Sequence, residues 1–242
     1  MSKVRILTAG ESALCVEFGN RISTEINAGI RGLNQEIWKR TIVGIVETVP
    51  TFRSLMVYYD CTKISYRKLV KKIEKILQNI ESDRPGEKVI VEIPVCYENP
   101  YSPDIQNVCE HTGLSREEVI SLHCGKDYLI YMLGFLPGFP YLGGMDERLN
   151  TPRLASPRVK IEAGAVGIGG EQTGIYPLAS PGGWQLIGKT PVKPYDPDRE
   201  EPLLYQAGQY IRFVRIDAVE YARIEALVLK NAYVCNIIKG GD

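Results

Sequence analysis

Residues 134–144 read GFLPGFPYLGG, residues 151–158 read TPRLASPR, and residues 164–190 read GAVGIGGEQTGIYPLASPGGWQLIGKT. The segment from residue 131 to residue 190 holds 12 of the 23 glycines and 6 of the 15 prolines of the chain. Glycine permits positive φ and close backbone approach, and proline fixes φ near −65°. Because aromatic and aliphatic residues are interleaved with them, the segment has apolar surface to bury. We therefore predict a compact β-barrel with tight corners and a pocket lined partly by main chain.

The pattern of apolar residues in the first third of the chain predicts a small α/β unit. A strand is predicted at residues 13–18, and the helix after it has an apolar stripe formed by Ile26, Ile30, Leu33 and Ile37. Strands at 42–49 and 55–59 follow. Ser65 then begins a second helix, whose apolar face is formed by Leu69, Ile73, Ile76 and Ile80. The order βαββα predicts a split-βαβ, ferredoxin-like sheet with both helices on one face.

A linker is predicted at residues 81–86, ESDRPG, where polar residues and Pro-Gly break the pattern. We therefore expect a small N-terminal α/β domain at residues 1–86 and a β-barrel domain at residues 87–242. A further strand at 88–95 fits either domain. The predicted fold class is α+β.

The second domain is predicted to begin with two short helices. Residues 102–104 (SPD) combine a helix cap, a proline and a first-turn acid, and Gly113 is typical of a helix end. Capping boxes are predicted at residues 115–118 (SREE) and 217–220 (DAVE). The remaining predicted elements are a helix over 219–229 and strands over 128–133, 209–216 and 233–238.

Composition and charge exclude several classes of function. Lys and Arg number 29, as do Asp and Glu, so we expect no general binding to nucleic acid or to anionic membranes. The longest uncharged run, residues 128–145, contains four glycines and two prolines, which is not typical of a transmembrane helix. No signal peptide is visible, and no cysteine pair has C-x-x-C spacing. We expect a cytoplasmic protein with six free thiols and no metal site.

One literal motif is misleading. Residues 183–190, GWQLIGKT, match the phosphate-binding pattern G-x-x-x-x-G-K-[ST]. That pattern needs a flexible loop followed by a helix, whereas Trp-Gln-Leu-Ile favours a strand, and Pro194 would interrupt a following helix. We predict a strand that ends in a basic residue.

Two arginines are candidate site residues. Arg153 and Arg158 each follow a proline and stand five positions apart, beside the glycine-rich segment. A guanidinium binds a carboxylate or phosphate through two hydrogen bonds, so the pair can hold an anionic ligand. Structural salt bridges at the barrel corners are the alternative interpretation.

His123 is a second candidate, as an acid, a base or a hydrogen-bond donor. Its place in the last turn of a helix is also favoured by the helix dipole alone, which is the interpretation we prefer for His111. Four further residues of the glycine-rich segment can line a pocket or stabilise its backbone: Gln172, Ser180, Trp184 and Gln185.

The glycine-rich segment also carries a family resemblance. The stretches that carry it are SLHCGKDYLIYMLG (121–134), GFLPGFPYLGG (134–144), PRLASPRVKIEAGAVGIGG (152–170) and QTGIYPLASPGGWQLIGKTP (172–191). They resemble the family of the 5-oxoprolinase B subunit, which also holds allophanate hydrolase subunit 1 and the sporulation kinase inhibitor. The resemblance covers most of the chain and is weakest in the first third. It implies a cyclophilin-like barrel at residues 87–242.

The resemblance further implies an activity with partners. Members work with a homologous C subunit, which is similar to allophanate hydrolase subunit 2, and with a lactam-utilisation-type A subunit. Together they open 5-oxo-L-proline to L-glutamate at the expense of ATP. Arg153 and Arg158 would then hold a carboxylate or phosphate, and His123 would move a proton. We expect these three side chains to converge on one cavity, and we expect the chain to be inactive alone. Inhibition of a histidine kinase and a role in a urea or allophanate pathway stay open as alternatives.

Overall fold

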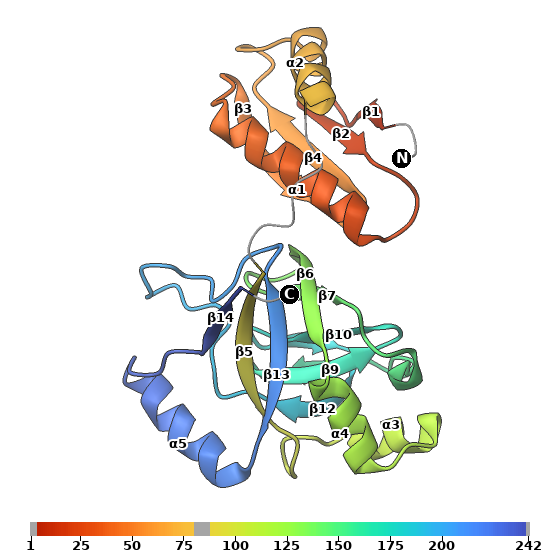
Figure 1. The fold of residues 1–242 in the computed structure, drawn as a ribbon, viewed down its shortest axis with the longest axis vertical. Coiled ribbons are helices and arrows are strands. Elements are labelled where there is room, and N and C mark those ends of the chain that lie inside the picture. The colour runs from red at the N-terminus through yellow and green to blue at the C-terminus, as the bar shows by residue number, and fades with distance from the viewer. Residues whose placement is uncertain (1–3, 80–87, 241–242) are drawn as a thin grey trace. The chain divides into compact units, whose positions relative to one another are not determined.

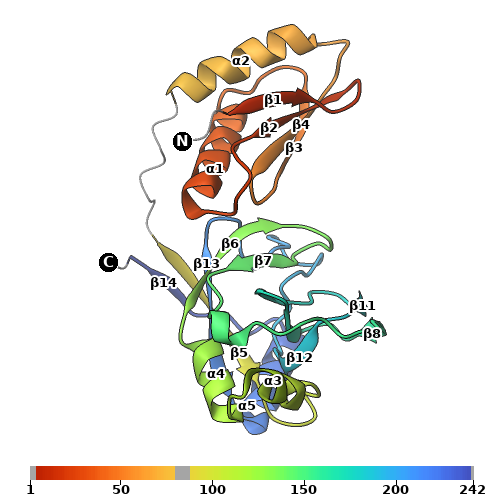
Figure 2. The ribbon, with the colours of Figure 1, turned by 90° about the vertical axis from the view of Figure 1, so that its right-hand side faces the viewer.

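The structure is a computed structural model that describes residues 4–79 and 88–240. It is of the predicted α+β class, with a small sheet in the first part of the chain and a barrel-like sheet in the second (Figures 1 and 2). The chain divides into two compact units, residues 1–86 and 87–242. The predicted linker and Ile80 lie outside the described residues.

The first unit holds a four-stranded antiparallel sheet in the order β1-β2-β4-β3. The predicted split βαβ is present, because β4 lies between the parallel strands β2 and β3. The edge beside β2 is filled by β1, a strand that the sequence analysis did not predict. The bounds are β1 Arg5–Thr8, β2 Ala13–Glu17, α1 Thr24–Lys39, β3 Ile45–Pro50, β4 Ser54–Tyr59 and α2 Tyr66–Asn79.

Alternation along the strands places one apolar face against both helices. Leu14 and Val16 of β2 are fully buried with Leu55 and Val57 of β4. The predicted stripes of α1 and α2 pack on this face through Ile30, Leu33, Ile37, Leu69, Ile73 and Ile76. The Ser23 hydroxyl caps α1 by accepting a hydrogen bond of 3.1 Å from the Ile26 amide.

The second unit is built on an eight-stranded sheet among the described residues. Its strands follow the order β10-β9-β12-β5-β13-β6-β7, and β14 also pairs with β5. β7 and β10 stand at the two ends of this order and lie against each other, so the sheet is nearly closed. The strands are β5 Val89–Cys96, β6 Asp127–Leu133, β7 Pro140–Gly143, β9 Ala165–Gly169, β10 Gln172–Ile175, β12 Gln185–Lys189, β13 Tyr210–Ile216 and β14 Ile237–Lys239.

The strand at residues 88–95, which fitted either domain by sequence, belongs to this barrel as β5. It pairs in parallel with β13 and antiparallel with β14. Helices of this unit gather at one end of the barrel (Figures 1 and 2). They are α3 Ile105–Thr112, α4 Arg116–Cys124 and α5 Ala218–Leu229; η1 (Glu147–Leu149) is a single 3₁₀ turn, and β8 (Arg158–Ile161) and β11 (Ser180–Gly182) form a separate ribbon.

Helix starts differ from the sequence prediction at two places. Ser102 is not the cap of α3: the helix begins at Ile105, and the Ser102 hydroxyl donates to the Tyr97 carbonyl at 2.5 Å. The capping box of α4 and the glycine end of α3 at Gly113 are confirmed. In α5 only half of the predicted box forms, because Asp217 caps the helix while the Glu220 carboxylate binds Arg223.

We propose that the two compact units are independent domains. A fragment of residues 88–242 contains every strand of the barrel sheet and its own core. It is expected to unfold cooperatively on heating and to keep the near-ultraviolet circular dichroism of packed aromatic side chains. A fragment that melts without a cooperative transition would contradict a boundary near residue 86.

Candidate functional site

Arg158 is held in place by a buried carboxylate. It begins β8, and its Nη2 donates to Oδ1 of Asp104 at 2.6 Å. The other oxygen of Asp104 accepts the Leu186 amide at 2.7 Å, and the Asp104 side chain is 6% exposed. Asp104 thus fixes one half of the guanidinium. The other half, Nη1, is buried and has no hydrogen-bond partner among the described residues.

Trp184 lies beside the other candidate guanidinium, that of Arg153. Its indole lies over Gly169 of β9, where a Cβ would overlap the ring. Phe139 and Tyr176 pack edge-on against it, with centroids 5.6 and 6.1 Å away. Arg153, which is exposed, places its guanidinium carbon 5.9 Å from the indole centroid. Glycine at position 169 is therefore what lets Trp184 support Arg153.

Both arginines act on the phenol of Tyr176, a residue that the sequence analysis missed. Burial raises the pKa of Tyr176, and the positive charges of Arg153 and Arg158 oppose that rise. The phenol therefore stays protonated at neutral pH and can donate. The phenol and the two guanidinium groups that act on it offer donors for a small carboxylate or a phosphate. We call Arg153, Arg158, Tyr176 and Trp184 the arginine site.

The other predicted binding residues have different surroundings. Ser180 lies opposite Ile161 in the β8–β11 ribbon, and its buried Oγ has no partner among the described residues. Gln172 pairs with Gly169, so its side chain projects from the same sheet face as the Trp184 ring. The amide of Gln185 donates to the Pro152 carbonyl at 3.0 Å and accepts from Asn107. Gln185 therefore anchors the loop that carries Arg153.

His123 lies elsewhere, in the main core of the barrel. It is completely buried and stacks on Phe213 with a centroid distance of 4.4 Å. Its hydrogen-bond partner Thr173 lies on β10, between Gln172 and Gly174. Because neighbouring side chains of a strand point to opposite faces, Thr173 projects from the face opposite to that of Gln172 and the Trp184 ring. The expectation that His123 and the two arginines converge on one cavity is therefore wrong.

The hydrogen bonds of His123 define one tautomer. The Thr173 hydroxyl donates to the Gly167 carbonyl at 3.0 Å, so it must accept from His123 Nε2, 2.8 Å away. Nδ1 then accepts from the Tyr97 hydroxyl at 2.7 Å. Burial lowers the pKa of His123 to about 3. A neutral imidazole with both nitrogens in hydrogen bonds stabilises the core. It is poorly suited to exchange a proton with a substrate.

A second surface feature of the barrel is an apolar hollow of about 530 Å³. It is lined by Leu133, Gly134, Phe135, Leu136, Pro137, Gly138, Tyr195, Pro202 and Leu203. Phe135 is 67% exposed and has a positive φ of 68°, a conformation that costs energy for a residue with a side chain. The Tyr205 hydroxyl holds the loop by donating to the Gly138 carbonyl at 3.0 Å. The loop therefore exposes an aromatic side chain from a strained backbone position.

Four further observations concern the GWQLIGKT motif, the thiols, metal binding and membrane spanning. Residues 185–189 form β12, so GWQLIGKT is a strand as predicted and not a phosphate loop. All six cysteines are free thiols, and burial raises the pKa of Cys235 to about 12. Within residues 4–79 and 88–240, no cluster of three or more His, Cys, Asp or Glu could hold a metal ion. None of the described helices is both long and apolar enough to cross a membrane.

Comparison with known proteins places the chain among carboxyltransferase domains. Residues 4–205 match the family "Carboxyltransferase domain, subdomain C and D". The chain is 41% identical over 229 residues to the 5-oxoprolinase B subunit of Bacillus subtilis (strain 168), covering 90% of this chain and 95% of the relative.

Solved structures show the same fold inside longer chains. TTHA0988 is 35% identical with a TM-score of 0.76, over 89% of this chain and 41% of the other. The K. lactis urea amidolyase has a TM-score of 0.81 at 22% identity, over 98% of this chain and 16% of the other.

Proposed function

Since the chain belongs to the carboxyltransferase-domain family, subdomain C and D, we propose that it is the B subunit of an ATP-dependent enzyme that opens 5-oxo-L-proline to L-glutamate. The arginine site carries this proposal, in particular the buried Nη1 of Arg158, which has no partner among the described residues. The positive charge of Arg158 also acts on the phenol of Tyr176. 5-Oxoproline is a small ring with one carboxylate. Arg153 and Arg158 suit that carboxylate or a phosphate, and Tyr176 offers a further donor.

The reaction that we propose runs through phosphoryl activation. The terminal phosphoryl group of ATP moves to the lactam oxygen, and ADP leaves. Water adds to the activated carbon, the carbon–nitrogen bond breaks with protonation of the nitrogen, and a second water releases phosphate from the acyl phosphate. In this chain the arginine site orients the anion. His123 takes no part in proton transfer, because its ring is buried and engaged on both nitrogens.

The proposal includes partner proteins. The chain matches only 41% of TTHA0988, so that protein carries further sequence joined to the part that resembles this chain. We propose that two separate chains, a homologous C subunit and a lactam-utilisation-type A subunit, complete the site in the cytoplasm. Purified chain and both partners, given 5-oxoproline and ATP, should form glutamate and phosphate in equal amounts. Turnover of urea or allophanate instead would assign the chain to that pathway.

The apolar hollow is the proposed contact for the C subunit. Phe135→Asp places a charge in the hollow and should weaken binding of that partner at least about tenfold, because buried aromatic anchors dominate interface energy. Val219→Asp is the matched control, since Val219 is 80% exposed on α5. Binding is measured by analytical ultracentrifugation. Equal effects of the two substitutions would place the contact elsewhere.

Inhibition of a histidine kinase is the second candidate function, and the same exposed hollow is the observation that favours it. An inhibitor binds its kinase through this chain alone, without the lactam-utilisation-type partner. Autophosphorylation of a sporulation kinase should then fall on addition of this chain and recover with Phe135→Asp. Unchanged autophosphorylation leaves the role in the enzyme as the sole proposal.

A further inference from the structure

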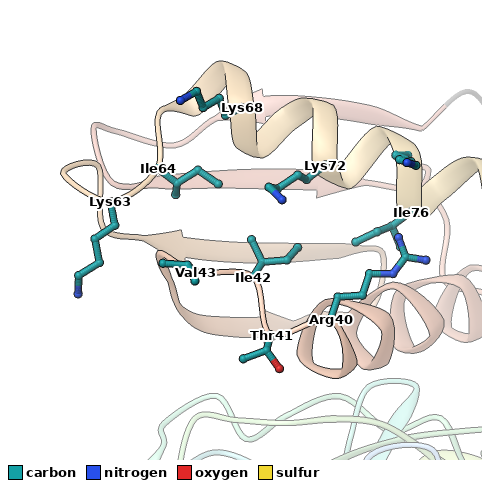
Figure 3. A pocket seen from close by; sticks show the side chains of 10 residues that line it. Arg40, Thr41, Ile42, Val43, Lys63, Ile64, Lys68, Lys72 and Ile76 are labelled. Atoms are coloured by element: carbon teal, nitrogen blue, oxygen red, sulfur yellow. The ribbon is translucent and has the colours of Figure 1, made fainter.

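The first unit contains a basic hollow of about 510 Å³ that the arginine site does not involve. It lies between α2 and the loop that follows α1 (Figure 3). Its lining residues are Arg40, Thr41, Ile42, Val43, Lys63, Ile64, Lys68, Lys72, Lys75 and Ile76. Five of the ten are Lys or Arg and none is acidic.

Three of the cations have no counter-charge in the part of the chain that the structure describes. Arg40 pairs with Glu36 and Lys63 with Asp60. By contrast, no carboxylate among the described residues lies within 4.0 Å of Lys68, Lys72 or Lys75. These three follow one another at spacings of four and three residues, so they are neighbours on one helix face and repel each other. A bound anion would relieve that repulsion.

The charged residues are unevenly distributed along the chain, although the net charge is zero. This distribution also favours an anion site in the first unit. Residues 1–86 hold 14 Lys and Arg against 9 Asp and Glu, a formal charge of +5. Residues 87–242 hold the remaining 15 and 20, a formal charge of −5. The general absence of a basic excess therefore does not apply to the first unit, and α2 carries much of its charge.

The hollow also has an apolar floor. Ile42, Ile64 and Ile76 lie between the basic residues, and Figure 3 shows Arg40 extending toward Ile76 while Lys63 points away. Gly44, with φ of 99°, lets the Ile64 side chain approach so closely that a Cβ would overlap it. The backbone of Asp60 donates to the Gly44 carbonyl at 2.7 Å. The position of Ile64 in the floor is thus fixed by close packing and by this backbone hydrogen bond.

We propose that this hollow binds a phosphorylated small molecule that has at least two phosphate groups and an apolar ring of nucleotide size. The lysines supply point charges for the phosphates, and the isoleucines supply a surface for the ring. The volume is that of a small-ligand pocket, whereas a protein partner would need a much larger buried area. The inference does not rest on the proposed function, since the hollow lies in the other unit of the chain.

The test uses the full chain without partner proteins or 5-oxoproline, with ADP and inorganic pyrophosphate as probes. Titration is followed by calorimetry and by NMR shifts of residues 40–43 and 63–76. Lys72→Gln should weaken ADP binding about three- to fivefold. Lys71→Gln is the matched control, because it removes the same charge from the same helix outside the lining. ADP should bind more tightly than pyrophosphate.

Each other outcome overturns part or all of the proposal. Equal losses in Lys71→Gln and Lys72→Gln would mean general electrostatic attraction without a site. If pyrophosphate binds as tightly as ADP, the apolar floor does not contribute to binding of the ring. Absence of shifts at millimolar ADP, or binding only to phosphatidylserine vesicles, would exclude a small-molecule site.

Discussion

Acid should destabilise the barrel through His123 more than through any other single group that we identify. The pKa of His123 is about 3 in the folded chain, well below its ordinary value of 6.5. Below pH 6.5 the unfolded chain takes up a proton at this position and the folded chain does not, so falling pH favours unfolding. Stability contributed by the neutral ring is complete above pH 6.5 and is lost toward pH 3. The loss between pH 6 and 4 is about 2 to 3 kcal/mol.

His123→Gln isolates this contribution. The variant should be less stable at pH 7 by about 2 to 4 kcal/mol, because it disturbs two buried hydrogen bonds and the stack on Phe213. Its free energy of unfolding should nevertheless fall less between pH 6 and 4 than that of the parent. Urea unfolding is followed by Trp184 fluorescence in a Trp38→Phe background, since the chain has two tryptophans. His111→Gln, at an exposed position, is the control. If the free energy of unfolding falls by the same amount in His123→Gln and in the parent between pH 6 and 4, then His123 takes up a proton in the folded chain.

Arg153→Ala and Arg158→Ala should separate catalysis from stability. Arg153 is exposed and rests on Trp184, so its loss should cost the fold only about 0.5 to 1 kcal/mol. Loss of its contact with an anionic substrate should lower kcat/KM of the assembled enzyme about ten- to hundredfold. Arg158→Ala should lower both the stability of the fold and kcat/KM. It leaves the buried Asp104 carboxylate without its ion pair, which should cost about 2 to 4 kcal/mol of stability.

Lys160→Ala is the matched control for both variants. Lys160 is a cation in the same ribbon, paired with Glu162 and more than half exposed. It should change neither the melting temperature nor kcat/KM. If Arg153→Ala also keeps full activity, Arg153 does not contact the substrate. If Arg153→Ala melts as early as Arg158→Ala, both arginines are structural.

Local signals in the sequence predicted much of the fold. Ile30, Leu33 and Ile37 are buried on α1 as their spacing required, and Ser115 forms its capping box. β1 was missed because RILT is only four residues long and lies at a sheet edge. Such short strands depend on their neighbour more than on their own sequence.

Long-range contacts were not predictable in the same way. The SPD segment indicated a helix start, yet Asp104 binds Arg158 and Leu186, which are 54 and 82 positions away. The motif around His123 gave no sign of which barrel face its ring occupies, because that depends on how α4 packs against β13. Tyr176 carried a weak signal: a tyrosine within a glycine-rich apolar segment needs a partner for its hydroxyl.

Formation of glutamate from 5-oxoproline and ATP by the reconstituted complex is the most direct test of the proposed function. The chain alone should give none, and the chain with both partner proteins should give glutamate. The same mixture with Arg153→Ala should give it about ten- to hundredfold more slowly at an equal degree of assembly. Full turnover by the isolated chain, or no turnover by the complete and correctly assembled mixture, would contradict the account.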